Sequence, residues 1–148
     1  MFRECSHWRN RSESTHCPHN SPLASNQTPA TYLHMTNIIA TLLTIAFGLF
    51  GFLAPRYTAS ALDLEPTKST MGLSEMRASV GGLFVFMGLA AFWLDHPIAY
   101  AMIGFAFVGA ALGRVVSLIF DKPPLAKVLV FGGIEAALAV AFLGVNLS

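Results

Sequence analysis

Long apolar stretches dominate the chain after its first 34 residues. Uncharged runs extend from Ile38 to Pro55, from Ala78 to Leu94 and from Ile98 to Gly113, and a fourth stretch from Val128 to Val145 contains a single charged residue. A run of about 18 apolar residues is long enough to cross a bilayer as a helix. The pattern therefore predicts four membrane-spanning helices, over about residues 37–54, 74–94, 97–120 and 125–143.

Composition strengthens this interpretation. The chain is 54% hydrophobic and only 11% charged, whereas soluble proteins contain about 25% charged residues. A soluble helical protein would also need a polar face recurring every 3.6 residues along each helix, and none of the four stretches has one. Because the connections after Leu94 and Phe120 are short, neighbouring helices must be antiparallel. We therefore expect an all-α integral membrane protein, an antiparallel four-helix bundle.

The first 34 residues differ sharply from the rest. They are rich in Ser, Asn, His, Pro and Arg and have no hydrophobic period, which predicts a disordered tail over residues 1–34 and a membrane domain over residues 35–148. Met35 is a candidate true start. The tail contains Cys5-Ser6-His7 and Cys17-Pro18-His19, but their spacing matches no structural zinc pattern, so we expect no metal site.

Other classes of function find little support. A net charge of +1, with no basic stripe interleaved with aromatic residues, argues against nucleic acid as a partner. The chain has no glycine-rich phosphate loop and no nucleophile with a recognisable base, so the sequence favours a non-catalytic protein and requires no cofactor. The expected partner is the lipid bilayer, and a membrane protein or a second copy of the chain is a further candidate.

Ionisable residues at or inside the apolar stretches are the candidate chemistry, because a charge in hydrocarbon is costly and marks a functional hypothesis. An up-down-up-down topology brings the start of the second helix, the end of the third and the start of the fourth to one membrane face. The candidate ligand-binding or ion-pair cluster at that face consists of Glu75, Arg77, Arg114, Ser117, Asp121 and Glu135.

Arg114 and Glu135 form the deep end of this predicted cluster. At 1.5 Å per residue, Arg114 lies about 9 Å in from the end of its helix and Glu135 about 15 Å in from the start of its own, a difference within reach of an arginine side chain. Small residues near the charges would allow helices to approach closely. The predicted packing positions are Gly81, Gly82, Gly109, Gly113 and Gly132. For Gly109 and Gly113, contact within the chain is favoured over a dimer interface.

Two interpretations of the Arg114 and Glu135 positions remain open. A neutral pair could simply fix the register of two helices. Alternatively, desolvation could let Glu135 carry a proton, or Arg114 could hold an anionic ligand head group.

Several short motifs resemble one bacterial family. Gly72-Leu-Ser-Glu-Met-Arg-Ala78, Gly81-Gly-Leu-Phe84 and Leu112-Gly-Arg114, followed by Ser117 and Asp121-Lys-Pro123, are similar to the four-helix membrane proteins grouped as domain of unknown function 4345. The resemblance covers about Ile38 to Val145. It implies a four-helix membrane fold without a known activity. A more distant similarity to DoxX-like proteins implies a redox accessory role, by analogy alone.

Together these features predict an accessory or small-ligand-binding protein of a bacterial cytoplasmic membrane. Two alternatives belong to other classes. The first is a proton-coupled carrier that depends on Glu135, and the second is a quinone-linked redox subunit that uses the site at Arg114.

Orientation in the membrane follows from the distribution of Lys and Arg. Arg56, Lys68, Arg77, Lys122 and Lys127 all lie at one face, and the opposite face has none within about twenty residues of a helix end. We therefore predict that both termini lie outside the cytoplasm. A reporter fused to the C-terminus should be active only outside the cytoplasm, and a cytoplasmic signal would show the orientation to be wrong.

Overall fold

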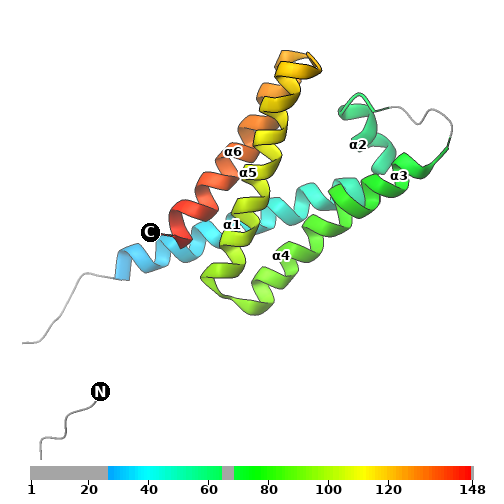
Figure 1. The fold of residues 1–148 in the computed structure, drawn as a ribbon. Coiled ribbons are helices and arrows are strands. Elements are labelled where there is room, and N and C mark those ends of the chain that lie inside the picture. Colours follow the sequence, from blue (N-terminus) through cyan, green and yellow to red (C-terminus); the bar gives the residue numbers. More distant parts are fainter. Residues whose placement is uncertain (1–26, 65–68, 148) are drawn as a thin grey trace, which may run out of the picture.

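A computed structural model describes residues 27–64 and 69–147 of the chain, and the regular elements in these ranges are all helical (Figure 1). The elements are α1 (Gln27–Leu53), α2 (Pro55–Ala61), α3 (Met71–Glu75), the π-helical segment η1 (Met76–Gly82), α4 (Leu83–Leu94), α5 (Pro97–Phe120) and α6 (Leu125–Asn146). Helices α3, η1 and α4 continue into one another as a single span, Met71–Leu94. Within the described ranges, four spans are long and apolar enough to cross a membrane. The predicted all-α membrane fold is confirmed.

The N-terminal boundary was predicted wrongly. Helix α1 begins at Gln27 rather than near residue 37, so residues 27–34 are helical and do not belong to a disordered tail. Hydropathy detects only the apolar part of a helix, and polar residues can continue it beyond the hydrocarbon layer. The rest of the predicted tail, with both Cys-x-His pairs, lies outside the described residues.

The other spans follow the predicted boundaries more closely. Helix α5 has the predicted bounds, and α6 extends three residues past the predicted end at residue 143, to Asn146. The side chain of Asn146 donates a further hydrogen bond of 2.7 Å to the carbonyl oxygen of Phe142, one turn earlier in the same helix.

The second span contains the π-helical turn, which the sequence did not predict, and it starts at Met71 rather than Ser74. The backbone of η1 lies directly against that of α1 at Gly81. A Cβ atom added to Gly81 would lie 2.5 Å from the amide nitrogen of Phe52 and 2.8 Å from the carbonyl carbon of Gly51. Only glycine permits this approach, so α1 and the second span form a tight pair.

The four spans are arranged as two antiparallel pairs. Helix α1 packs against η1 and α4, and α5 packs against α6. The pairs meet at the end that contains the α4–α5 turn and diverge toward the end that contains α2 and the α5–α6 turn (Figure 1). The chain is therefore closed at one end and open at the other.

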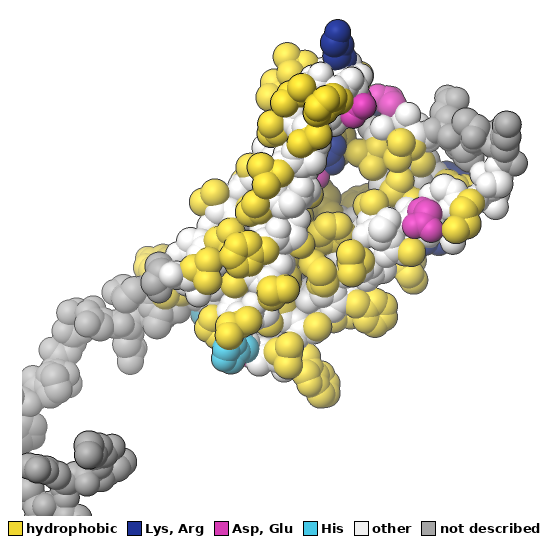
Figure 2. Space-filling view, in the orientation of Figure 1, with side chains coloured by type: hydrophobic (Ala, Val, Ile, Leu, Met, Phe, Trp, Pro, Cys, Tyr) yellow, Lys and Arg dark blue, Asp and Glu magenta, His cyan; other side chains and the backbone are white. Residues whose placement is uncertain are grey.

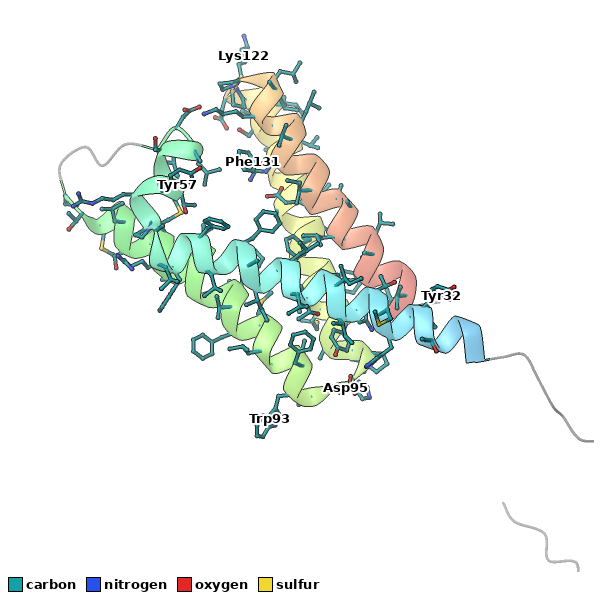
Figure 3. All side chains as sticks on the ribbon, turned by 180° about the vertical axis from the view of Figure 1, so that it is seen from behind. Tyr32, Tyr57, Trp93, Asp95, Lys122 and Phe131 are labelled. Atoms are coloured by element: carbon teal, nitrogen blue, oxygen red, sulfur yellow. The ribbon has the colours of Figure 1, made fainter. Side chains whose placement is uncertain are left out.

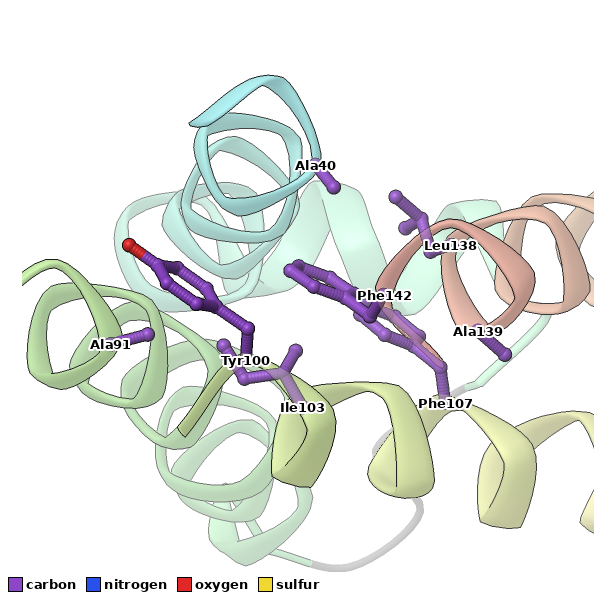
Figure 4. Packing of buried hydrophobic residues seen from close by; sticks show 8 residues of the cluster. All are labelled: Ala40, Ala91, Tyr100, Ile103, Phe107, Leu138, Ala139 and Phe142. Atoms are coloured by element: carbon purple, nitrogen blue, oxygen red, sulfur yellow. The ribbon is translucent and has the colours of Figure 1, made fainter. Parts of the chain in front are cut away.

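A compact apolar cluster holds the two pairs together (Figure 4). Phe142 is completely buried at its centre, and its ring is nearly parallel to that of Phe107, with 6.4 Å between the centroids. The buried members of the cluster come from α1, α4, α5 and α6: Ala40, Ala91, Tyr100, Ile103, Phe107, Leu138, Ala139 and Phe142. Buried aromatic contacts of this kind contribute strongly to core stability.

Paired amides strengthen the closed end. The Asn37 amide donates to Oδ1 of Asn146 at 2.9 Å, and the Asn146 amide donates to Oδ1 of Asn37 at 2.8 Å. These reciprocal bonds join α1 to α6. Nearby, the Tyr100 hydroxyl donates to Oδ1 of Asp95 at 3.1 Å.

The outer surface of the helices is apolar. Large hydrophobic side chains such as Phe86, Trp93, Phe120 and Val140 are exposed, and Trp93 is 89% exposed at the end of α4 (Figure 3). Water would oppose this much exposed hydrocarbon, whereas lipid solvates it. The protein is a membrane protein.

Gly109 and Gly113 do not make the helix contact predicted within the chain. A Cβ atom at either position would meet nothing within 4 Å among the described residues. Helix α5 instead presents Gly104 to α6, where an added Cβ would lie 2.8 Å from Cγ of Leu143. The spacing of small residues identified the right helix, but it did not fix which side of that helix faces α6.

Replacing Gly81 with alanine should destabilise the protein. The added methyl group would force the backbones of α1 and η1 apart, at a cost of about 1 to 3 kcal/mol. We expect a lower midpoint of thermal unfolding in detergent for Gly81→Ala. The matched control, Gly109→Ala, adds the same methyl group to open space and should leave the midpoint unchanged or raise it. Equal midpoints for the two variants would contradict the close contact.

Candidate functional site

A cleft of about 390 Å³ lies where the two helix pairs diverge. Its walls are mostly apolar and contain five phenylalanines contributed by α1, α4, α5 and α6: Phe47, Phe50, Phe84, Phe107 and Phe131. Helix α2 supplies a further wall through Tyr57 and Ala61, and Leu62 follows directly after the helix. Figure 2 shows the surface hollowed between the α5–α6 pair and the α2 region, with hydrophobic side chains around the hollow.

Arg114 and Glu135 form an ion pair in the wall of this cleft. Nε of Arg114 donates to Oε2 of Glu135 at 2.7 Å, and Nη2 donates to Oε1 at 2.8 Å. This two-pronged geometry is the strongest that a guanidinium and a carboxylate can adopt. The side chains are 30% and 16% exposed respectively. The pair joins α5 to α6 and leaves its polar edge open to the cleft.

Two neighbours on α6 hold Arg114 in place. The Phe131 ring lies beneath the guanidinium, with 5.4 Å from Cζ of Arg114 to the ring centroid, a favourable cation–π geometry. Phe131 and Glu135 are four residues apart and therefore share one helix face. A Cβ atom at Gly132 would lie 3.4 Å from Cδ of Arg114, so the glycine leaves room for the arginine side chain to lie along α6.

The aromatic wall continues into the core. The rings of Phe84 and Phe107 are stacked with 5.4 Å between their centroids, and Phe107 stacks in turn on Phe142. Phe107 lines the cleft and is also a buried member of the core cluster. The deep wall of the cleft is therefore fixed by the same packing that holds the helix pairs together.

A second ion pair spans the open end. Nζ of Lys127 on α6 lies 2.6 Å from Oδ1 of Asp63 and donates to the carbonyl oxygen of Ala61 at 3.2 Å. Both charged side chains are about half exposed, so the pair contributes little energy, about 0 to 1 kcal/mol. Its effect is positional, because it ties the end of α2 to α6 beside the cleft. The sequence did not predict this contact, because Lys127 was counted only among the positive residues that indicate the orientation in the membrane.

The structure brings together only two of the six residues of the predicted cluster. Arg77 donates a hydrogen bond to the carbonyl oxygen of Phe52 and thus fastens the second span to α1. The carbonyl oxygen of Glu75 accepts from the Ser79 hydroxyl at 2.6 Å.

The last two members of the predicted cluster lie at the end of α5. The carbonyl oxygen of Ser117 accepts a hydrogen bond of 2.8 Å from the backbone amide of Asp121. Asp121 is the C-cap residue of α5. Glu75, Arg77, Ser117 and Asp121 do not line the cleft. Divergence of the helix pairs separates the second span from α5 and α6 at this face, which the topology alone could not predict.

Comparison with known families identifies the domain. A family described as domain of unknown function (DUF4345) matches residues 33–145, more than half of the chain. The chain belongs to the DUF4345 family. No curated protein and no solved structure matches it. Every residue that lines the cleft falls inside the matched region, so the ion pair and its aromatic walls are part of the DUF4345 domain itself.

Removing one member of the ion pair should impair folding of this DUF4345 protein. Arg114→Gln or Glu135→Gln leaves an uncompensated charge among apolar helices, at a cost of about 2.5 to 3.5 kcal/mol near a helix centre. We expect each single variant to give less folded protein by size-exclusion chromatography in detergent. The exchange Arg114→Glu with Glu135→Arg should recover much of the loss, because it restores a neutral pair.

The matched control is Lys122→Gln, which removes an exposed charge and should not change the yield. A double exchange that folds no better than either single variant would argue against mutual compensation.

Proposed function

We propose that this protein binds a small amphipathic molecule in the cleft between its helix pairs and acts as a non-catalytic binding or accessory protein of the membrane. One observation carries the proposal. An ion pair with unused hydrogen-bonding capacity is set into the wall of an otherwise mostly apolar cavity.

The size and lining of the cleft support this function. Ligand sites are concave, mostly apolar, and contain a few convergent polar groups within about 300 to 1,000 Å³. The cleft has about 390 Å³ and five phenylalanines, and its two charged groups lie side by side. This volume suits a molecule of one to three rings or a short chain.

A purely structural ion pair explains less of the geometry. Fixing the register of α5 and α6 would require only that Arg114 and Glu135 meet, and it would work best with both groups enclosed between the two helices. Instead, Arg114 is 30% exposed and lines the cavity with its partner. The same pair can therefore join the helices and also present polar groups to a bound molecule.

The alternative functions receive unequal support. A proton carrier would need Glu135 to exchange a proton, yet both of its oxygens accept hydrogen bonds from Arg114, and protonation would weaken this arrangement. A quinone-linked redox subunit is the better second candidate, because aromatic walls accept a flat ring. Copurification with a quinone and a catalytic partner would favour it over a binding protein that works alone.

The cleft also has a proposed orientation. The diverging end of the helix pairs contains Arg56, Arg77, Lys122 and Lys127, and positive residues concentrate at the cytoplasmic side of membrane proteins. We place the protein in a bacterial cytoplasmic membrane with the cleft in its cytoplasmic half. Lys68, the fifth positive residue, lies outside the described residues.

Retention of small molecules tests the proposed function. We expect protein purified in mild detergent to retain a small molecule that native mass spectrometry detects. Ala61→Phe should reduce retention severalfold, because Ala61 lines the cleft and the larger side chain would occupy it. The matched control, Ala90→Phe, adds the same ring to an exposed position on α4 and should retain the molecule. Equal retention by both variants would place the molecule elsewhere.

A further inference from the structure

We infer that the cleft selects electrically neutral, ring-containing molecules that carry a hydrogen-bond acceptor such as a ketone carbonyl. This inference rests on the proposed function and names the ligand class of the same site. Charge balance, unused donors and aromatic walls each supply one part of it.

The charges of the cleft-lining residues cancel, and this determines which net charge of ligand the cleft favours. Arg114 and Glu135 neutralise each other, and they are the only acidic or basic residues among the cleft-lining side chains of the described ranges. An anion would bring a second negative charge beside Glu135, and a cation would meet Arg114. Either would lie unpaired among phenylalanines, and burying an unpaired charge is costly. A neutral molecule avoids both penalties.

Unused donors determine its polar group. A guanidinium has five N–H donors, and within the described residues Arg114 donates hydrogen bonds only from Nε and Nη2, both to Glu135. A pure hydrocarbon in the cleft would cover the remaining N–H groups without satisfying them, which costs free energy. A carbonyl oxygen accepts from them without adding charge. The hydroxyl of Thr58, a further polar lining group, is already bonded to the carbonyl oxygen of Ala54 at 3.2 Å.

Aromatic walls determine its shape. Phe47 and Phe50 on α1 are about half exposed although they line the cleft, and Phe131 lies across the cavity on α6. Figure 3 shows Tyr57 on α2 and Phe131 on α6 on opposite sides of this space. Flat rings stack on such faces at centroid separations of about 4.5 to 7 Å. A ring system therefore fills the cleft better than a flexible chain does.

Three photoreactive probes that share the benzophenone ring system test this inference on the intact protein. Benzophenone is neutral, 4-benzoylbenzoate is anionic, and (4-benzoylbenzyl)trimethylammonium is cationic. On irradiation the ketone oxygen takes a hydrogen atom from a nearby C–H group, and the two carbon radicals join. Peptide mass spectrometry then locates the new bond. Labelling is measured in detergent and divided by labelling at the exposed Val140, which corrects for partition into the micelle.

We expect the neutral probe to label cleft peptides around Tyr57 and Phe131 about tenfold more than either charged probe, a ratio that corresponds to about 1.4 kcal/mol. Two variants should change the order in which the three probes label the cleft, and labelling is measured on the folded protein of each. Glu135→Gln leaves the arginine charge and should favour the anionic probe, whereas Arg114→Gln leaves the carboxylate and should favour the cationic one. Lys122→Gln, the matched control, should keep the wild-type order.

The outcomes separate the inference from the proposed function. Cleft labelling by a charged probe that equals or exceeds that of benzophenone would overturn the inference and leave the binding function intact. Labelling at Val140 without labelling of the cleft by any probe would overturn both. If neither variant folds, the order of the three probes on the wild-type protein decides the question.

Discussion

Hydrocarbon offers no hydrogen-bond partner to a polar side chain, and this constraint governs where the polar groups of the protein lie. Inside the membrane a polar side chain without a partner in the chain is costly. Among the described residues, the hydroxyl of Thr41 is the buried polar group that makes no hydrogen bond. Arg114 finds Glu135, Asn37 finds Asn146, and the Thr44 hydroxyl donates to the carbonyl oxygen of Ala40 at 2.8 Å. The first two of these contacts join different helices. The rare polar residues thus fix the register of α5 against α6 and of α1 against α6.

The cleft follows from an unequal distribution of close contacts. Glycines bring the backbones of α1 and η1 together, and Gly104 admits the side chains of α6 against α5, so each pair is tight. Between the pairs, the aromatic core lies at one end only. The two helix pairs are therefore in contact at one end and separate at the other. The space between their separated ends is bounded by Phe47, Phe131 and helix α2.

Sequence reasoning could predict the features that depend on position along a helix. The number of spans, the bounds of α5 and the depth match between Arg114 and Glu135 all follow from hydropathy and the rise per residue. Features that depend on helix rotation or divergence could not be predicted. The sequence does not reveal that Gly109 faces open space, that Asp121 lies apart from the pair, or that a π-helical turn interrupts the second span. The Lys127 contact with Asp63 also requires the tertiary fold, because 64 residues separate them.

For the proposed neutral ligand, the ion pair is better suited to recognition than either charge alone. A lone arginine in an apolar cleft would bind anions strongly but would be costly when the cleft is empty, and a lone glutamate would have the opposite preference at a similar cost. Pairing removes most of that cost and leaves directional N–H groups on a site with no net charge. Phe131 beneath the guanidinium and Gly132 beside its side chain keep these groups in a fixed position. A site of this kind discriminates by hydrogen-bond geometry and shape, so its affinity for a neutral ligand should depend only weakly on salt, unlike that of a charged site.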